Sequence, residues 1–554
     1  MASVARSTRR RRHIEDWKAL PWKKIQRNVF RLQQRIYRAE RRGDWKQVHN
    51  LQRLLLHSWS ARCLAVRRVT QDNRGKRTPG VDGVASLTPK QRMVLIEELQ
   101  NLTGWAVDPI RRTYIEKRGT TEKRGLGIPT MRDRAMQALV KLTLEPEWEA
   151  KFEPNSYGFR PGRSAHDAIG AIFNFIRFKS KYVLDTDIEK CFDYIDHEAL
   201  LKKLNTIQPT ARLVREWLKT GIVEGDEMLF PEAGTPQGGV ISPLLCNVAL
   251  HGLEAILIAV SKQYRIAVIR YADDLVILCE DLETLMKAKE KAEAWLAEMG
   301  LRLKPSKTRV THTLDEYKGN IGFDFLGFNI RQYRVGKHHT RTFRGKPGFK
   351  TLIKPSPSAV KRHLREIRDI IRRHRGAPQA ALIVKLNPVI RGWAQYYRGC
   401  VAKRVFSKID QQVYEKLAQW AHYRHRNKTD EWRYQRYWRR RKGRVSFCDE
   451  TSTLARHTDT PIVRHVKVRG DKSPYDGDWP YWGQRLGNDP TKPTRVTRLL
   501  KRQKGCCALC GLHFAAEDIT EVHHWDGNRT NNRYTNLALL HGYCHDQTHG
   551  KRCL

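Results

Sequence analysis

Apolar positions in the first part of the chain recur at the spacing of an α-helix, from about residue 17 to residue 69. The spacing predicts one buried helix face, formed by Val29, Leu32, Ile36 and Tyr37. Glycine and proline in "RGKRTPGVDGV" (74–84) end this pattern. A mixed helix and strand pattern then continues to about Arg331, where a polar, glycine-containing linker begins.

A second helical pattern follows this linker, and we expect a small all-helical domain over residues 357–430. Ser358 is placed to cap its first helix and Gly376 to end it. Asn387 and Pro388, an N-cap residue followed by proline at the first helical position, predict the start of the next helix. The first of these helices would bury Val360, Leu364, Ile367 and Ile371.

Two apolar runs, residues 266–269 and 275–279, flank the adjacent carboxylates Asp273 and Asp274. Short apolar runs around a polar tip predict a β-hairpin that is too apolar to have a solvated face. Carboxylates buried there would need a compensating cation. Taken alone, the pair favours an ordinary Asp-Asp turn over a metal site.

A third carboxylate favours the cation over the turn. "YVLDTD" (182–187) carries a strand-like run into Asp187, and three carboxylates suit two Mg²⁺ ions that activate a 3′-hydroxyl and hold a triphosphate. "TPQGGVISPLLCN" (235–247) lies between them; its paired glycines let the backbone approach a ligand, and Ser242 begins a helix. With an amphipathic helix over 285–299, these elements predict an α+β palm.

The charge of the chain points to a polyanionic partner. The 554 residues, enough for several domains, include 104 Lys and Arg against 58 Asp and Glu, a formal charge of +46. We interpret this as nucleic-acid binding rather than as a device for solubility alone.

No uninterrupted apolar run reaches the length of about 18 residues that a membrane span needs. The Arg-rich start lacks the apolar block of a secretory signal, and we interpret it as a nucleic-acid-binding arm rather than an organellar transit segment.

A basic aromatic segment, "EWRYQRYWRRRKGR" (431–444), follows the helical domain. Its arginines can neutralise phosphates while its rings stack on bases, which favours nucleic-acid binding over a merely solvated run of charge. Some of the rings could instead belong to a core. The rings concerned are Trp432, Tyr434, Tyr437 and Trp438.

Cysteine and histidine gather at the C-terminal end. A disulfide scaffold is not expected in a long, Lys-rich chain with 11 cysteines, so we predict a reducing compartment and a local metal site. Two knuckles about thirty residues apart predict a tetrahedral structural Zn²⁺ site, with the ligands Cys507, Cys510, His541 and Cys544. The alternatives are that Cys506 or Cys553 supplies a ligand, or that no zinc is bound.

Residues 271–274, "YADD", match the catalytic box of reverse transcriptases, and the chain resembles the group II intron-encoded branch of that family. The resemblance covers about residues 75–330 and implies a right-hand polymerase with fingers and palm, which uses dNTPs and holds Mg²⁺ with Asp187, Asp273 and Asp274. The motifs that carry it are "TPGVDG" (78–83), "RGLGIPTMRDR" (124–134), "NSYGFRPGRSAHDAI" (155–169), "DIEKCFDYIDH" (187–197), "TPQGGVISPLLCN", "LKPSKT" (303–308) and "FDFLGF" (323–328).

The same resemblance implies a nucleotide-binding set. Phe192 corresponds to the bulky gate beneath the incoming sugar, where a ring would collide with a 2′-hydroxyl, and Gln237 to a glutamine that contacts the nucleotide. Lys117 and Arg124 resemble the finger cations that grip the triphosphate. Ile188 completes the set. For the two cations, a plain surface role is one alternative, and the neighbouring choices are Arg118 and Lys123.

"LNPVIRGWAQYYR" (386–398) resembles the helical X domain, which serves as thumb and RNA-binding maturase domain in group II intron proteins. We expect most of its aromatic surface, at Trp393, Tyr396 and Tyr397, to be core. Arg391 and Arg398 are then the expected RNA-facing residues. The resemblance implies that the protein stabilises folded intron RNA through shape and backbone contacts.

The C-terminal segment also resembles the HNH nucleases, which are built on a ββα-metal motif. By this resemblance His524 is the general base that activates water, and Asn536 orients the loop. A neutral imidazole can accept the proton near pH 7 while a metal stabilises the developing charge. One divalent ion, Mg²⁺ or Mn²⁺, would be held by His523, His545 and His549.

Together the resemblances imply a group II intron-encoded RNA-directed DNA polymerase, splicing maturase and metal-dependent DNA endonuclease. It would act with its intron RNA on double-stranded target DNA in intron mobility, where cleavage releases a 3′-hydroxyl that the polymerase extends (target-primed reverse transcription, retrohoming). We expect a bacterial cytoplasmic location, with an organelle as the alternative. The rival functions are a non-catalytic RNA-binding splicing factor and an intron-independent reverse transcriptase in defence or repair.

The predicted regions are a basic helical extension (1–72), fingers and palm (73–335), a linker (336–356), the thumb/X domain (357–430), a basic DNA-binding region and linker (431–504) and the HNH domain (505–554).

Overall fold

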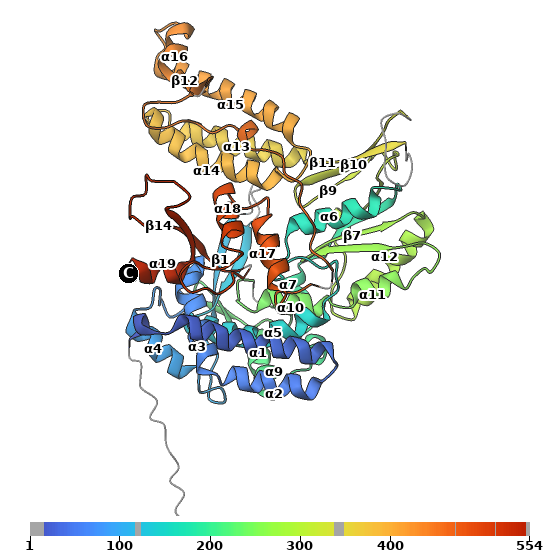
Figure 1. The fold of residues 1–554 in the computed structure, drawn as a ribbon. Helices are drawn as coiled ribbons and strands as arrows, with labels where there is room; N and C mark the ends of the chain where they lie inside the picture. The colour runs from blue at the N-terminus through green and yellow to red at the C-terminus, as the bar shows by residue number, and fades with distance from the viewer. Residues whose placement is uncertain are drawn as a thin grey trace, which may run out of the picture.

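The computed structural model describes residues 16–116, 123–235, 237–336, 348–441, 443–470, 472–515 and 517–549. It is a mixed α+β structure, as predicted. Figure 1 shows the first helices (blue) at one end, the orange helices α13 to α15 at the other, and the palm between them. The last segment of the chain (red) returns to lie against the first helices.

A base of helices surrounds the long α5, which is buried over most of its length. The predicted apolar face of α1 is confirmed, because Val29, Ile36 and Tyr37 are buried and Leu32 is partly buried. α1 packs along α5, where Gln33 Nε2 donates a 3.0 Å hydrogen bond to a backbone carbonyl. The elements are η1 (Trp17–Ala19), α1 (Trp22–Arg41), α2 (Trp45–Leu56), α3 (Trp59–Arg67), η2 (Arg68–Asp72), η3 (Arg74–Arg77), α4 (Pro89–Glu98) and α5 (Met131–Lys151).

The finger sheet has the strand order β2-β1-β4-β5. β1 pairs antiparallel with β2 and parallel with β4. The strands are β1 (Ile110–Glu116), β2 (Lys123–Ile128), β4 (Ile222–Glu224) and β5 (Glu227–Leu229). Lys117 and Arg118, at the tip between β1 and β2, lie outside the described residues.

The palm sheet has the order β6-β7-β3-β8 and is buried on both faces. Because side chains alternate along a strand, Val276 and Leu278 face α6, whereas Leu275 and Ile277 face α12. The predicted hairpin is confirmed as the β6–β7 pair, and the predicted helix at Ser242 as α10. The strands are β3 (Tyr182–Asp187), β6 (Ala267–Tyr271), β7 (Asp274–Cys279) and β8 (Arg309–His312). The helices are α6 (Ala165–Ile176), α7 (Cys191–Tyr194), α8 (His197–Leu204), α9 (Gln208–Lys219), α10 (Ser242–Ala249), α11 (Leu253–Ile258), α12 (Leu282–Ala297) and η4 (Pro305–Lys307).

A small antiparallel sheet leads from the palm to three long helices: β9 (Phe323–Phe325), β10 (Phe328–Arg334), β11 (Phe349–Pro355), α13 (Pro357–Arg373), α14 (Gln379–Tyr397) and α15 (Lys403–Arg424). Three of our expectations about these helices were wrong. α13 ends at Arg373, with His374 rather than Gly376 as its C-cap. Ser356, not Ser358, caps α13. α14 begins at Gln379 and continues through Pro388. Leu386 and Ile390 are buried on either side of this proline, so packing outweighs the lost backbone hydrogen bond.

The basic aromatic segment packs on the far end of these helices as α16 (Asp430–Tyr437), β12 (Trp438–Arg441) and β13 (Arg444–Phe447). Tyr437 and Trp438 are buried in the helical core, whereas Trp432 and Tyr434 are 36% and 40% exposed. Of these four rings, only the latter two have substantial exposed surface, and the Tyr434 ring also stacks on Trp438 with 5.8 Å between ring centroids. Arg398 is also buried, so its predicted place on an RNA-facing surface was wrong; its Nε donates to the carbonyl of Pro461 at 3.2 Å.

Residues 461–478, which we call the connector, carry the chain from η6 (His457–Asp459) back across the palm to α17 (Trp479–Gly487). α18 (Thr494–Arg502) follows, then a hairpin and helix formed by β14 (Thr520–His524), β15 (Leu537–His541) and α19 (Gly542–Thr548). This C-terminal module contacts the first helices, where the Tyr543 hydroxyl donates to Gln26 Oε1 at 2.7 Å. The guanidinium of Arg67 lies 4.0 Å from the centroid of the Tyr543 ring.

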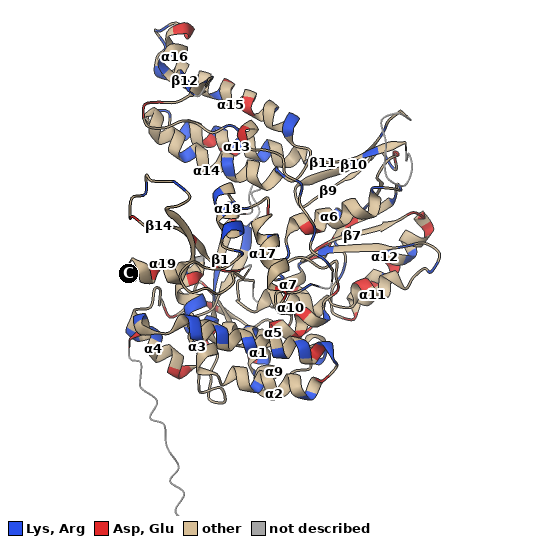
Figure 2. Cartoon of the chain, in the orientation of Figure 1, with Lys and Arg blue, Asp and Glu red and all other residues tan. Residues whose placement is uncertain are grey.

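Lysine and arginine are spread over α1, α13 to α15 and α18, with few acidic residues among them (Figure 2). Such a distribution suits contact with a polyanion over a wide surface. Among the helices of the described residues, none has both the length and the apolar character needed to cross a bilayer.

One carboxylate fastens the connector to the palm. Asp167, on α6, is fully buried and accepts hydrogen bonds from His465 Nε2 at 3.0 Å and from the backbone N of Val468 at 2.8 Å. Arg485 donates to both of its oxygens at 2.7 Å. Burial raises the pKa of Asp167, but the hydrogen bond from His465 and the charge of Arg485 outweigh it and hold the pKa well below its usual range.

We predict that Asp167→Ala loosens the connector, because it leaves Arg485 and His465 without their buried acceptor. Removing one partner of a buried pair typically costs about 3 kcal/mol. Hydrogen exchange of residues 461–487 should speed up at pH 7, whereas the exposed Asp226→Ala should leave it unchanged. In the wild type the stabilisation is complete above the ordinary carboxyl pKa of about 4 and is lost as the pH falls through the depressed folded-state pKa. Equal exchange in both variants would contradict this role.

Candidate catalytic and metal sites

Three carboxylates meet at one edge of the palm sheet. Asp187 ends β3 and lies directly opposite Asp274, which begins β7, so the two side chains share one face of the sheet. Asp273 lies in the two-residue tip between β6 and β7, and its carbonyl accepts a 3.0 Å hydrogen bond from the backbone N of Ile188. The bend at this tip lets a third carboxylate join the opposed pair.

A network behind the tip fixes its shape. Ala272 has a φ of 57°, in the left-handed region, and is buried. Gly158 lies so close that a Cβ on it would be 2.2 Å from the backbone N of Ala272. The buried Arg270 donates to the carbonyl of Ala272 at 3.3 Å and to Asn247 Oδ1 at 2.9 Å, and Asn247 donates in turn to the carbonyl of Gly158 at 2.8 Å. Gly158 and Asn247 fall within the motifs named above, but no local pattern indicates this role.

The palm edge carries surplus negative charge. Burial, followed by the charges of Asp273 and Asp187, raises the pKa of Asp274 to about 7. Burial and Asp187 likewise raise the pKa of Asp273. The ammonium of Lys307, in the "LKPSKT" motif, forms an ion pair with Asp187, an interaction that sequence reasoning missed. Buried carboxylates that need cations match the oxygen ligands that Mg²⁺ prefers, so the residues present fit such ions.

Gln237 links the fingers to the palm beside this edge. Its Oε1 accepts a 2.8 Å hydrogen bond from Arg124 Nε on β2, and its Nε2 donates to Asp193 Oδ1 at 3.0 Å. Its backbone carbonyl accepts from the backbone N of Gly127 at 2.6 Å. The close approach needs Gly238, where a Cβ would lie 2.5 Å from the carbonyl of Gly127.

Phe192 and Ile188 complete the described part of the predicted nucleotide set. Phe192 is buried next to Asp193, and its ring lies edge-on to that of Phe159 at 6.1 Å between centroids. Ile188 is buried, and its backbone N donates to the carbonyl of Asp273 in the β6–β7 tip. Of the five predicted residues, Lys117 lies outside the described residues; the other four lie near the palm edge through the contacts of Gln237 with Arg124 and Asp193, the neighbour of Phe192, and of Ile188 with Asp273.

The four predicted zinc ligands are buried and converge, with one donor atom from each lying within 4.8 Å of the others. His541 Nε2 lies 3.2 Å from Asp518 Oδ2, which leaves Nδ1, 3.4 Å from Cys510 Sγ, to face the thiols. A carboxylate behind a histidine ligand is a usual feature of metal sites. Cys506 lies apart, with its Sγ 3.3 Å from His513 Nδ1, and Cys553 lies outside the described residues. The residues present fit Zn²⁺.

Three histidines form a second cluster on the ββα unit. His523 on β14 and His545 on α19 converge with His549, with ligand atoms within 4.8 Å, and His523 Nδ1 lies 3.0 Å from His549 Nε2. His545 Nδ1 is paired with Glu521 at 2.8 Å. Burial and the neighbouring histidines lower the pKa of His523, which favours the neutral imidazole that a metal ligand must be.

Asn536 and His524 lie at the loop between β14 and β15. Asn536 Oδ1 accepts a 3.0 Å hydrogen bond from the backbone N of Asp526, and its Nδ2 donates to Asp526 Oδ1 at 2.8 Å. These contacts brace the loop that begins at His524. The His524 ring is partly exposed, with Nε2 3.4 Å from Asn532 Oδ1. Within the described residues, only the Cys/His group and the three-histidine group bring three or more potential metal ligands within 4.8 Å of one another. The palm carboxylates do not meet this distance limit.

Three known protein families match parts of this chain. The family described as reverse transcriptase (RNA-dependent DNA polymerase) matches residues 115–330. The N-terminal domain of reverse transcriptase matches residues 17–99, and the group II intron maturase-specific domain matches residues 360–438.

Several curated proteins are similar to the chain. Protein YkfC of Escherichia coli is 31% identical over 311 residues, which cover 48% of this chain and 79% of that protein. Maturase-like protein 1 of Euglena gracilis is 29% identical over 387 residues, covering 68% of this chain and 76% of that protein. The group II intron-encoded protein LtrA of Lactococcus lactis is 34% identical over 197 residues, but the chain spans only 33% of its length. The chain belongs to the group II intron reverse transcriptase and maturase family.

Proposed function

We propose that the chain is a group II intron-encoded RNA-directed DNA polymerase, splicing maturase and HNH DNA endonuclease that acts with its intron RNA in intron mobility. The observation that carries the proposal is the register of the palm sheet, which sets Asp187 against Asp274 beside the tip that holds Asp273. The proposed partners are intron RNA, double-stranded target DNA and dNTPs. The proposed location is the bacterial cytoplasm.

For polymerisation, the three palm carboxylates are the proposed metal ligands. Mg²⁺ ions bound there would lower the pKa of a primer 3′-hydroxyl and neutralise the triphosphate. Phe192 would exclude a 2′-hydroxyl beneath the sugar, and Gln237 would contact the nucleotide from the base of the fingers. Arg124, which is exposed and hydrogen-bonded to Gln237, would grip the triphosphate, as would Lys117.

For splicing, the exposed basic face of α13 to α15, including Arg391, is the proposed RNA contact. The two exposed rings of α16, Trp432 and Tyr434, lie at its far end and would stack on bases. Contacts of this kind bind folded RNA through its backbone and unpaired bases.

For DNA cleavage, His524 is the proposed general base and Asn536 the residue that braces its loop. His523, His545 and His549 would hold one Mg²⁺ or Mn²⁺, which would stabilise the charge that develops on the scissile phosphate. The separate Cys/His group is the proposed structural Zn²⁺ site. The cut strand would leave a 3′-hydroxyl, the substrate that the polymerase extends.

We predict that Asp273→Ala abolishes RNA-templated primer extension, by about 10³-fold or more, because the metal ligand acts in the transition state. The matched control is Asp226→Ala, which removes an exposed carboxylate in the β4–β5 turn and should extend primers like the wild type. Wild-type protein no more active than Asp273→Ala would reject the polymerase function and favour a non-catalytic splicing factor.

We predict about one zinc ion per chain in the purified full-length protein, by elemental analysis. Cys507→Ser should lose the metal and lower the melting temperature, because a structural site contributes its binding free energy to folding. Cys506→Ser is the matched control, since its thiol faces His513 instead. Equal zinc content in the two variants, or none in the wild type, would contradict the site.

We predict that His524→Ala stops cleavage of double-stranded target DNA by the ribonucleoprotein, while extension of a supplied primer continues. Asp273→Ala should show the reverse pattern, because the two centres use different side chains. The measurement is strand cleavage on a labelled target. Undiminished cleavage by His524→Ala would remove this residue from the nuclease mechanism.

A further inference from the structure

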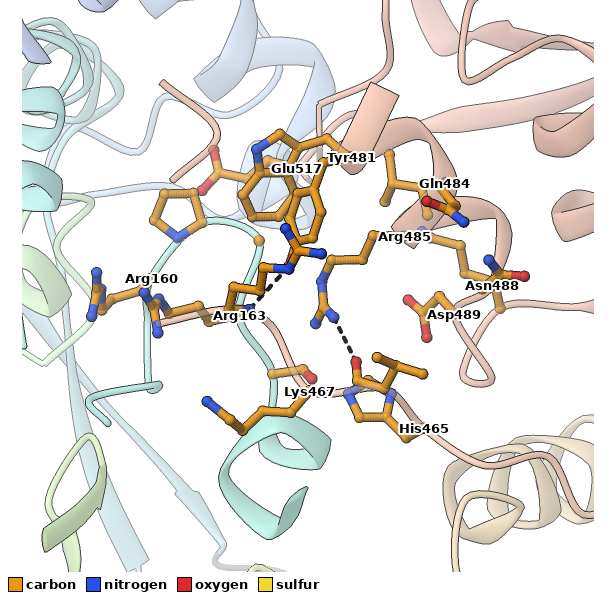
Figure 3. Close-up of a pocket in the computed structure, with 18 of the residues that line it drawn as sticks. Arg160, Arg163, His465, Lys467, Tyr481, Gln484, Arg485, Asn488, Asp489 and Glu517 are labelled. Carbon is orange, nitrogen blue, oxygen red and sulfur yellow. Dashed lines mark hydrogen bonds between the residues drawn. The ribbon is translucent and has the colours of Figure 1, made fainter. Parts of the chain in front are cut away.

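A cavity of about 850 Å³ lies between the palm and the connector. Its palm side is the loop of residues 159–164, with Tyr271 of the "YADD" box. Its opposite side is formed by residues 463–469 and by α17. Figure 3 shows Arg160 and Arg163 entering from one side and Arg485 from the other, with Lys467 between them. Because Tyr271 lies two residues before Asp273, the cavity begins beside the polymerase centre.

Some of the cations around the cavity are already neutralised. Arg160 forms a buried bidentate pair with Glu149, with hydrogen bonds of 2.8 and 3.0 Å. Arg485 is held by Asp167, as described above, and Lys141 lies 3.3 Å from the carboxylate of Glu145. The charges of Arg160, Arg485 and Lys141 are therefore balanced by carboxylates of the protein itself.

Five other cations have no such partner. Among the described residues, no carboxylate oxygen lies within 4.0 Å of the side-chain nitrogens of Arg163, Arg464, Lys467, Arg469 or Lys492. Arg163 donates instead to the carbonyls of Pro154 at 2.7 Å and Gly470 at 2.8 Å, and its buried Nε has no hydrogen-bond partner. The carboxylates left facing the cavity are Asp489 and Glu517.

The electrostatics agree with this unbalanced charge. Burial, with a smaller contribution from the neighbouring Arg160, lowers the pKa of Arg163 to about 10. Burial and the charge of Arg163 lower the pKa of Lys467. Cations lose affinity for their protons where no anion compensates them, so a bound anion would stabilise both.

Aromatic rings alternate with these cations. Phe159 is 48% exposed and lies next to the proposed sugar gate, Phe192. Tyr271 lines the palm side, and Tyr481 on α17 lies under the guanidinium of Arg469 at 5.5 Å. Rings among phosphate-binding cations are the usual platform for a nucleic-acid strand.

We propose that this cavity binds the sugar-phosphate backbone of the nucleic-acid strand that leads away from the polymerase centre. The connector and α17 would then form one wall of the polymerase's substrate path. The proposal rests on the proposed polymerase function. A free nucleotide offers the same phosphate chemistry, so the test must separate the two ligands.

The test uses the full-length protein and the double variant Arg464→Gln/Arg469→Gln. Both side chains belong to exposed residues, so the fold should survive, which a melting curve checks. Affinity for a labelled RNA-template/DNA-primer hybrid is measured by fluorescence anisotropy at several salt concentrations. We expect about tenfold weaker binding at low salt, and a slope of log K against log salt that is smaller by about 1 to 2, as the loss of two phosphate contacts implies. The control, Lys287→Gln/Lys291→Gln on the outer face of α12, removes the same charge and should change the affinity less than about twofold.

Neutral methylphosphonate linkages next to the primer 3′ end, placed in the primer or in the template, identify the strand. They should weaken binding by the wild type and add nothing in the Arg464→Gln/Arg469→Gln variant. An equal loss in both proteins, or equal affinity and salt slope in variant and control, would overturn the proposal. So would a raised KM for dNTP with unchanged hybrid affinity, which would make the cavity a nucleotide site. A wild type that binds hybrids but never extends them would reject the polymerase function alone.

Discussion

The palm sheet holds carboxylates close together although their negative charges repel one another. Asp187 faces Asp274 because β3 and β7 pair in one register, and slipping that register by one residue would turn every apolar side chain of β7 to the wrong face. The apolar packing of the strands on α6 and α12 therefore maintains an arrangement that the charges oppose. Lys307 and the network of Arg270, Asn247 and Gly158 hold the edge in place.

The charge opposite the palm edge has the complementary sign. A polymerase must hold a strand whose phosphates repel its own carboxylates, so cations are needed close to the proposed metal-binding edge. The connector supplies Arg464, Lys467 and Arg469 there although it follows the thumb by sequence. The same segment continues through α18 to the C-terminal module. It therefore connects the two proposed catalytic centres within one chain.

Much of the site could be predicted from sequence, because its residues fall in short segments with strong local patterns. The hairpin at Asp273, the helix at Ser242 and the convergence of the Cys/His ligands follow from alternation and spacing. The burial of Arg398 and the role of Asp167 could not be predicted, because they depend on partners about 60 and 300 residues away that local periodicity does not reveal. The start of α14 was missed because buried packing overrides the preference of Pro388 for a helix start.

In the proposed mechanism, one chain both makes and extends a 3′ end. The most direct measurement gives the wild-type ribonucleoprotein an uncut DNA duplex carrying its target, with dNTPs, and sequences the junctions of the new DNA. We expect complementary DNA of the intron joined covalently to the 3′ end of the cleaved strand. Complementary DNA found only on unlinked primers, with the target duplex intact, would contradict it.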